Sequence, residues 1–175
     1  NTSAFGVANT VSGGNDNAFG TGNQISDSDN ATAVGFGNTV DTATGSFAAG
    51  SDNTLVGDNS GAIGAGNRVN GLDSNGVGTR NTVAGTGSNA FGTGNNVSGD
   101  VAIAVGNGNS AASSEAVAIG ANNAANARAT AVGVGNLADA VGSSAIGTDN
   151  QVTGEFSTAV GASNSVESIF HTAIG

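Results

Sequence analysis

Small and apolar residues recur along the chain in a short cluster of the form Ala, apolar residue, Gly, and the cluster returns at nearly constant spacing. Its closing glycines are Gly6, Gly20, Gly35, Gly50, Gly64, Gly78, Gly92, Gly106, Gly120, Gly133, Gly147, Gly161 and Gly175. Ala precedes each glycine by two positions, with Gly76 as the one exception, and Asn follows each of the first twelve by three. A flexible glycine-rich linker keeps no such register, so the pattern predicts a fold built from internal repeats.

The repeat length decides which kind of repeat fold is expected. A period of roughly 14 positions is too short for a pair of helices, and glycine costs a helix roughly 1 kcal/mol relative to Ala. It suits two short strands joined by two turns, each coil pairing with the next along the axis. We therefore predict an all-β chain, a parallel β-solenoid of about twelve 14-residue coils, which forms a single repeat domain over residues 1–175.

Glycine and asparagine are the fixed residues of each repeat. The glycine fits a turn that needs a positive φ or a close approach of two backbones. The asparagine tolerates the left-handed conformation and caps its own turn, and stacked copies of its side chain would form an amide ladder. The predicted turn residues are Gly20, Gly35, Gly64, Gly92, Gly120, Gly147, Asn23, Asn38, Asn67, Asn95, Asn123 and Asn150.

The strand before each glycine has apolar residues at adjacent positions, which point to opposite faces of a strand. Ala stands on one face and mostly Val, Ile or Phe on the other. The strand after each Asn alternates, as in Arg68-Val69, and buries one face, with Ala124-Ala125 and Leu137-Ala138 as exceptions. Since one coil has a single interior, the first strand predicts contact with another chain; the alternative is that the Ala row is a smooth exposed face. The residues predicted for this core strand and interface are Ala18, Ala33, Ala62, Ala90, Ala118, Ala145, Ile63, Ile119 and Ile146.

Acidic residues are concentrated in one part of the repeat, six to ten residues after the glycine, where the repeat length also varies. Eleven of the 13 carboxylates lie in this window, Asp16 among them. Solenoids commonly place variation on a binding face, so this edge is the candidate ligand-binding site. The alternative is a solvated edge that keeps the protein soluble. The candidate residues are Asp27, Asp29, Asp41, Asp58, Asp73, Asp100 and Glu115.

Composition excludes several functions. Thirteen carboxylates against three arginines give a net charge of -10, which argues against nucleic acid as a partner. The chain has no Cys and no Lys, and its single histidine, His171, lacks an evident catalytic partner. We therefore expect no enzyme activity, no cofactor and no metal site. A surface position is the expectation for His171; the alternative is that three copies gather on a trimer axis and bind a metal or an anion.

The runs Ala118-Ile119-Gly120-Ala121-Asn122-Asn123, Ala145-Ile146-Gly147-Thr148-Asp149-Asn150 and Thr158-Ala159-Val160-Gly161-Ala162-Ser163-Asn164 resemble the head repeats of trimeric autotransporter adhesins, the YadA-like heads. The resemblance covers the whole chain. It implies a left-handed parallel β-roll, assembled as a homotrimer on the outer-membrane surface of a Gram-negative bacterium. It further implies a head fragment, anchored by other segments and without direct membrane contact of its own. Phe at the Ile/Val position and Gly76 in the Ala row depart from the family pattern.

The resemblance implies adhesion by multivalent binding, with a host matrix protein, a cell surface or an abiotic surface as the partner. No ligand motif of the family can be placed on this chain. The alternatives are an ice-binding solenoid, for which Thr21, Thr79, Thr93 and Thr148 form too interrupted an array, and a purely structural spacer. A polysaccharide-cleaving solenoid is not expected, because the coils are too narrow for a cleft.

Overall fold

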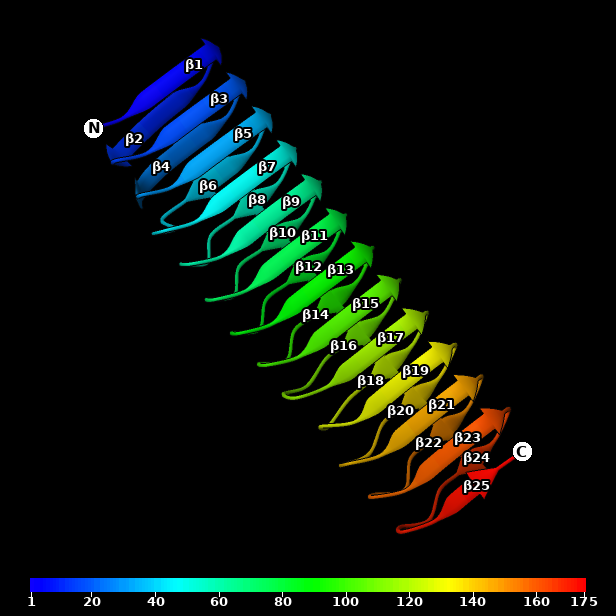
Figure 1. The fold of residues 1–175 in the computed structure, drawn as a ribbon. Helices are drawn as coiled ribbons and strands as arrows, with labels where there is room; N and C mark the ends of the chain where they lie inside the picture. The colour runs from blue at the N-terminus through cyan, green and yellow to red at the C-terminus, as the bar shows by residue number, and fades with distance from the viewer. The chain divides into compact units, whose positions relative to one another are not determined.

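The computed structural model describes all 175 residues and contains strands and turns but no helix. The fold is a parallel β-solenoid of about twelve turns, each the length of one sequence repeat, as the pattern predicts. Two compact units make up the chain, Asn1–Gly87 and Ser88–Gly175, and each is described by itself. In both units, strands with odd numbers form one parallel sheet and strands with even numbers form a second, which we call the odd sheet and the even sheet (Figure 1).

The first unit contains twelve strands. Its odd sheet consists of β1 (Ser3–Val7), β3 (Asn17–Thr21), β5 (Thr32–Phe36), β7 (Phe47–Ser51), β9 (Gly61–Ala65) and β11 (Asn75–Thr79). Its even sheet consists of β2 (Thr10–Gly14), β4 (Gln24–Asp29), β6 (Thr39–Asp41), β8 (Thr54–Leu55), β10 (Arg68–Val69) and β12 (Thr82–Val83).

The second unit repeats the same alternation and ends on an odd strand (Figure 1). Its odd sheet consists of β13 (Asn89–Thr93), β15 (Ile103–Asn107), β17 (Val117–Ala121), β19 (Thr130–Val134), β21 (Ser144–Thr148), β23 (Thr158–Ala162) and β25 (Thr172–Ile174). Its even sheet consists of β14 (Asn96–Val97), β16 (Ser110–Ala111), β18 (Ala124–Ala125), β20 (Leu137–Ala138), β22 (Gln151–Val152) and β24 (Ser165–Val166).

Strand register is kept even where the repeat length changes. Gly20 pairs with Gly35 across a repeat that is longer than most, and Gly120 pairs with Gly133 across a repeat that is shorter. The connection from an odd strand to the next even strand, the short turn, keeps its length. We call the connection from an even strand to the next odd strand the long turn. The insertions lengthen the even strands β4 and β6, and the deletion shortens the long turn after β18. The prediction that length varies in this window is confirmed.

The interior of each unit is narrow and lined by small residues. The alanine two positions before each glycine is fully buried in every complete inner turn, for example Ala62 in β9. In most turns it faces one larger residue from the even sheet, such as Val69 in β10, which is also fully buried. In the second unit, Ala takes this place in β16, β18 and β20. The alternative that the Ala row is an exposed face is therefore wrong. The larger apolar residue next to each alanine points outward instead.

The repeated glycines lie within the odd strands, close to their ends, rather than in a turn. From Gly6 to Gly161 their φ angles run from 112° to 125°, a region that L-residues rarely occupy. A Cβ built on Gly64 would also collide with the carbonyl oxygen of Gly78, its neighbour in the next turn. Both predicted reasons for glycine, a positive φ and a close backbone approach, are confirmed, while the predicted place in a turn is wrong.

The repeated asparagines form the amide ladder that the sequence predicts. In the first unit, Asn53 Nδ2 donates to Asn38 Oδ1 at 2.9 Å, and Asn67 Nδ2 donates to Asn53 Oδ1 at 3.0 Å. These side chains are almost fully buried. The expected left-handed backbone is one residue earlier: Gly66, before Asn67, has the positive φ. In the ladder each Asn side-chain amide points into the solenoid, and the residue before the Asn adopts the left-handed conformation that turns the backbone.

Candidate functional site

A row of outward-facing apolar side chains follows the odd sheet in both units, and we call it the apolar row. In the first unit it comprises Phe5, Phe19, Val34, Ala49, Ile63 and Val77. In the second unit it comprises Phe91, Val105, Ile119, Val132, Ile146, Val160 and Ile174. None of these residues is buried, and most are exposed. Soluble proteins rarely expose such contiguous apolar surface without a contact partner.

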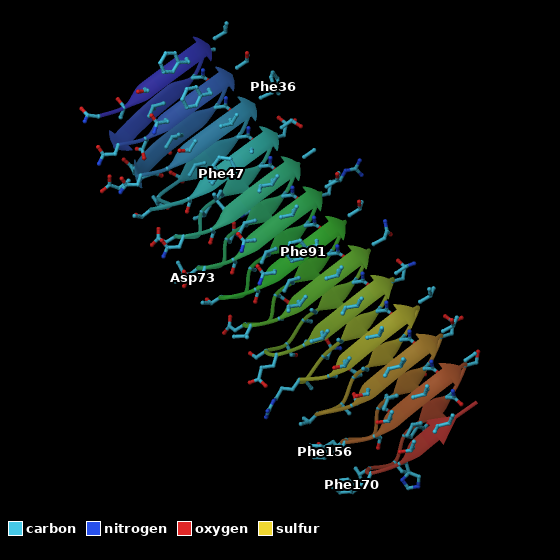
Figure 2. The ribbon with its side chains drawn as sticks, viewed as in Figure 1. Phe36, Phe47, Asp73, Phe91, Phe156 and Phe170 are labelled. Carbon is cyan, nitrogen blue, oxygen red and sulfur yellow. The ribbon has the colours of Figure 1, made fainter.

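Neighbouring columns widen this surface in the first unit. Phe36 and Phe47 project from the ends of β5 and β7, and both are exposed. The rings of Phe5 and Phe19 stack on each other, with their centroids 5.3 Å apart. Figure 2 shows Phe47 on the outer face of the odd sheet and Phe36 at the end of its strand.

The predicted interface residues are thus divided between two surfaces. Ala18, Ala33, Ala62, Ala90, Ala118 and Ala145 face the interior and are fully buried. Ile63, Ile119 and Ile146 belong to the apolar row and are exposed. Only the isoleucine side of this strand is therefore available to a second chain.

The candidate acidic residues lie in or beside long turns, apart from Asp27, which lies within β4. We call them the acidic edge: Asp27, Asp29, Asp41, Asp58, Asp73, Asp100 and Glu115. Most are exposed, and Figure 2 shows Asp73 at the tip of its long turn. Several carboxylates accept hydrogen bonds from the adjacent turn. Asp58 Oδ1 accepts from the backbone N–H of Thr44 at 2.6 Å, and Asp41 Oδ1 accepts from Ser26 Oγ at 2.6 Å. These carboxylates therefore help to join successive long turns.

One ion pair is present on this edge. Arg128 Nε donates to Glu115 Oε2 at 3.1 Å, and both side chains are more than half exposed. An exposed pair of this kind contributes roughly 0–1 kcal/mol, so it adds little to stability.

Asp16 does not lie on the exposed edge with the other acidic residues of its window. It is fully buried, Oδ1 accepts from the backbone N–H of Ala31 at 2.8 Å, and Oδ2 has no hydrogen-bond partner. Most other turns of the first unit carry serine at this place. Ser60 Oγ accepts from the backbone N–H of Ser74 at 3.0 Å and donates to the carbonyl oxygen of Gly71 at 2.8 Å. Asp16 reproduces the first contact and lacks the second.

His171 is exposed, and its Nδ1 lies 3.0 Å from the carbonyl oxygen of Ile169. It lines a small cavity of about 190 Å³ together with residues of β24 and β25, among them Val166 and Thr172. No group of three or more His, Cys, Asp or Glu side chains comes together in a way that would hold a metal ion.

The left-handed backbone of three bulky residues was not predicted from the sequence. Val101, Phe156 and Phe170 have positive φ angles of 55°, 52° and 57°. They stand nine residues after a repeat glycine, where other turns have Asn59 or Asp73. Aligning the repeats on their long turns would have singled them out, because bulky side chains are rare in this conformation.

The comparisons with known proteins assign no family. No protein-family model matches the chain, and no curated protein matches it in sequence. The structure has no helix that is long and apolar enough to cross a bilayer. The resemblance to trimeric autotransporter heads thus rests on the repeated residues of the chain itself.

Proposed function

We propose that the chain is the head of a trimeric surface adhesin of the YadA-like type, with a left-handed winding of the solenoid. The observation that carries this proposal is the apolar row. In each unit it presents one Ile, Val, Phe or Ala side chain per turn, in register, on the outer face of the odd sheet. An interface between three copies of the chain would cover this row and remove it from water.

The interior geometry supports the same proposal. The alanines occupy the narrow space inside each turn, which leaves no room there for Ile63, Ile119 or Ile146. Burying a fully exposed Ile or Val side chain is worth about 1.5–3 kcal/mol, and the row side chains, with Ile63 at 44% and Ile119 at 38% exposed, would each gain a part of this. Since each unit carries six or seven members of the row, these gains add up along the interface.

Adhesion would then work by multivalent display. Three identical acidic edges on one assembly raise avidity without strong individual contacts. A trimer would carry three times the net charge of -10 of one chain, which favours basic or neutral partners. The proposed location is the outer surface of a Gram-negative bacterium, and the proposed partner is a host matrix protein, a host cell or an abiotic surface.

The ice-binding alternative finds less support. Its threonines would have to form a regular array, but Thr21 shares its column with Val7 and Phe36 in the neighbouring turns. In the second unit, Val134 precedes Thr148 in the same way. A thermal hysteresis assay separates this activity from adhesion.

Sedimentation tests the assembly. The protein at micromolar concentration is expected to sediment at three times the 16.4 kDa of one chain. Ile63→Asp, Ile119→Asp and Ile146→Asp together should give a monomer with an unchanged β-sheet circular dichroism spectrum. The matched control places aspartates on the outer face of the even sheet, with Ser110→Asp and Gln151→Asp, and should remain a trimer. A monomeric native protein would contradict the proposed interface.

Binding assays test the adhesion. Wells coated with collagen, fibronectin, laminin, a glycan or bare plastic are incubated with the native protein and with the triple aspartate variant. Retention of the native protein, reduced in the monomeric variant, is the expected result. Attachment to a basic partner should weaken as salt rises. If the protein is trimeric but is retained on none of these surfaces, the result contradicts adhesion and favours a purely structural spacer.

A further inference from the structure

A second apolar surface lies on the long turns of the second unit, away from the apolar row. Its members are Val141, Phe156, Ile169 and Phe170, all exposed, and we call them the turn ridge. The backbone N–H of Phe156 donates to the carbonyl oxygen of Val141 at 2.9 Å, and that of Phe170 donates to the carbonyl oxygen of Glu155 at 3.0 Å. Successive long turns therefore hold the ridge together. Figure 2 shows Phe156 and Phe170 next to each other at this edge.

Neither phenylalanine contributes to the core. The exposed fraction of Phe156 is 55%, although turns of the solenoid flank it on both sides. Phe170 lies in the last turn, is stacked on one side only and is 75% exposed. Both residues have a left-handed backbone, which is unfavourable for a bulky side chain. Other long turns use Asn59, Asp73 or Gly142 in the same conformation. Folding therefore gains little from phenylalanine here, and a contact outside the molecule is the better explanation.

The arrangement of the rings limits what that contact is. The rings of Phe156 and Phe170 stack with their centroids 5.6 Å apart and their planes 13° from parallel. On the other side, a Cβ built on Gly142 would lie 2.9 Å from Phe156 Cδ1, so the ring covers this glycine. The stack covers one face of each ring, and the side of Phe156 toward Gly142 lies close to the backbone. A partner therefore meets ring edges and the outer face of Phe170, an apolar surface that suits aliphatic side chains.

The charges beside the ridge are all negative. Asp139, Glu155 and Glu167 stand in the same long turns and are exposed. The single arginine of the unit, Arg128, is paired with Glu115 of the preceding turn. Like charges disfavour a second copy of this surface or an anionic lipid headgroup as the occupant. Basic side chains on both sides of an apolar stripe would match this surface.

We infer that the turn ridge binds a basic amphipathic polypeptide segment, whose aliphatic side chains contact the rings of Phe156 and Phe170 and whose Lys or Arg side chains pair with Asp139, Glu155 and Glu167. This site is separate from the proposed trimer interface. It makes no use of the apolar row and is present in each chain.

The test uses three fluorescent peptides of equal length, one of Leu and Lys, one of Leu and Glu and one of Ser and Lys, and measures fluorescence anisotropy with the native protein. The Leu and Lys peptide should bind, with an affinity that falls as salt rises, and the other two should bind at least tenfold more weakly. The double change Phe156→Asn and Phe170→Asn should weaken binding of the Leu and Lys peptide at least tenfold. Asparagine suits the left-handed backbone, so the double variant should unfold at the same temperature as the native protein or higher.

The matched control is Val101→Asn, the same kind of substitution at the equivalent place of another long turn, and it should leave peptide binding unchanged. If the Ser and Lys peptide binds as tightly as the Leu and Lys peptide, net charge alone explains the binding. If the Leu and Glu peptide binds as tightly, the carboxylates do not contribute to it. Either result, or unchanged binding by the double variant, overturns the inference. A change in the sedimentation of the double variant would identify a second copy as the occupant and would overturn it too.

Discussion

The side-chain amide of Asn67 donates to the carbonyl oxygen of Gly78 at 2.9 Å and so joins the short turn of one coil to the odd strand of the next. The same Nδ2 donates to Asn53 Oδ1 and lies within reach of the carbonyl oxygen of Ile63, while Oδ1 accepts from the backbone N–H of Asn81 at 3.0 Å. Both ends of this buried side chain are used, and one of the groups that they serve, the backbone N–H of Asn81, belongs to a fully buried residue.

Replacing Asn67 tests the ladder. Asn67→Ala removes the acceptor of the buried Asn81 N–H and the donor to the half-buried Gly78 carbonyl, and a buried group left unsatisfied costs about 1–3 kcal/mol. We expect the free energy of unfolding in urea to fall by about 3 kcal/mol. Asn67→Asp should be worse, because it removes the donors and brings a charge into the interior. Asn70→Ala is the control: Asn70 is exposed and uses its backbone N–H, which Ala retains. Equal losses for Asn67→Ala and Asn70→Ala would contradict a special role of the ladder.

Two glycines in one segment are predicted to respond differently to the same substitution. Gly64→Ala forces a Cβ into the carbonyl oxygen of Gly78 at a φ of 118°, so the two turns have to separate. Gly66 has a φ of 64° and open space, with Arg80 Cγ 3.6 Å from the added Cβ. Gly66→Ala should therefore cost about 1 kcal/mol, the usual penalty for a left-handed L-residue. Gly64→Ala should cost at least twice as much, as measured by urea unfolding at one fixed protein concentration.

The sidedness of the even strands could be predicted from the sequence, because Arg68 and Val69 differ in polarity and adjacent residues of a strand face opposite ways. The sidedness of the odd strands could not, because Ala62 and Ile63 are both apolar. The structure places the smaller residue inside, since the Val69 side chain already fills the space opposite. A Cβ built on Gly76, in the next turn, lies 2.9 Å from Val69 Cγ2. The width of the coil, and not hydrophobicity, decides which residue is buried.

Features that depend on one turn rather than on the repeat were the hardest to predict. The acidic window contains Asp27 and Asp73, which are exposed, but the same window contains Asp16, which the fold buries. Sequence position alone does not distinguish a residue that points out of a turn from one that points in, when turn lengths vary. The left-handed backbone of Phe156 has no signal in the residue type, because Phe is a poor residue for that conformation, and only alignment of the long turns indicates it.

Gly76 offers a test of how closely the interior is packed. Its backbone is in an ordinary extended conformation, and glycine in a strand costs roughly 0.5–1 kcal/mol relative to Ala. The other turns accommodate Ala at this position beside the same column of aliphatic side chains. Gly76→Ala is therefore expected to raise the free energy of unfolding by about 0.5 kcal/mol, after a small shift of Val69. A loss of more than about 1 kcal/mol, typical of an overpacked core, would show that Val69 cannot move.

Val101 has a φ of 55°, an unusual value for a β-branched residue, and its side chain is 65% exposed. Val101→Asn should relieve the strain and raise the free energy of unfolding by about 1 kcal/mol. Val101→Ile keeps the β-branch and the exposure, so it should leave stability unchanged. An equal gain from both substitutions in thermal unfolding would mean that the backbone conformation is not its source.

Asp16 differs from the serines that take its place in other turns by one missing hydrogen bond. A Cβ built on Gly13 would collide with both Asp16 Oδ2 and the carbonyl oxygen of Ser28, so these two acceptors border the same small space. Asp16→Asn keeps an oxygen for the Ala31 N–H and places an amide donor beside the Ser28 carbonyl. Since an unsatisfied buried polar atom costs about 1–3 kcal/mol, this variant should be more stable by about 1 kcal/mol in urea unfolding. Asp16→Ala also removes the hydrogen bond from the Ala31 N–H, so it should not gain stability. If Asp16→Ala is as stable as Asp16→Asn, loss of the buried carboxylate alone accounts for the gain in stability.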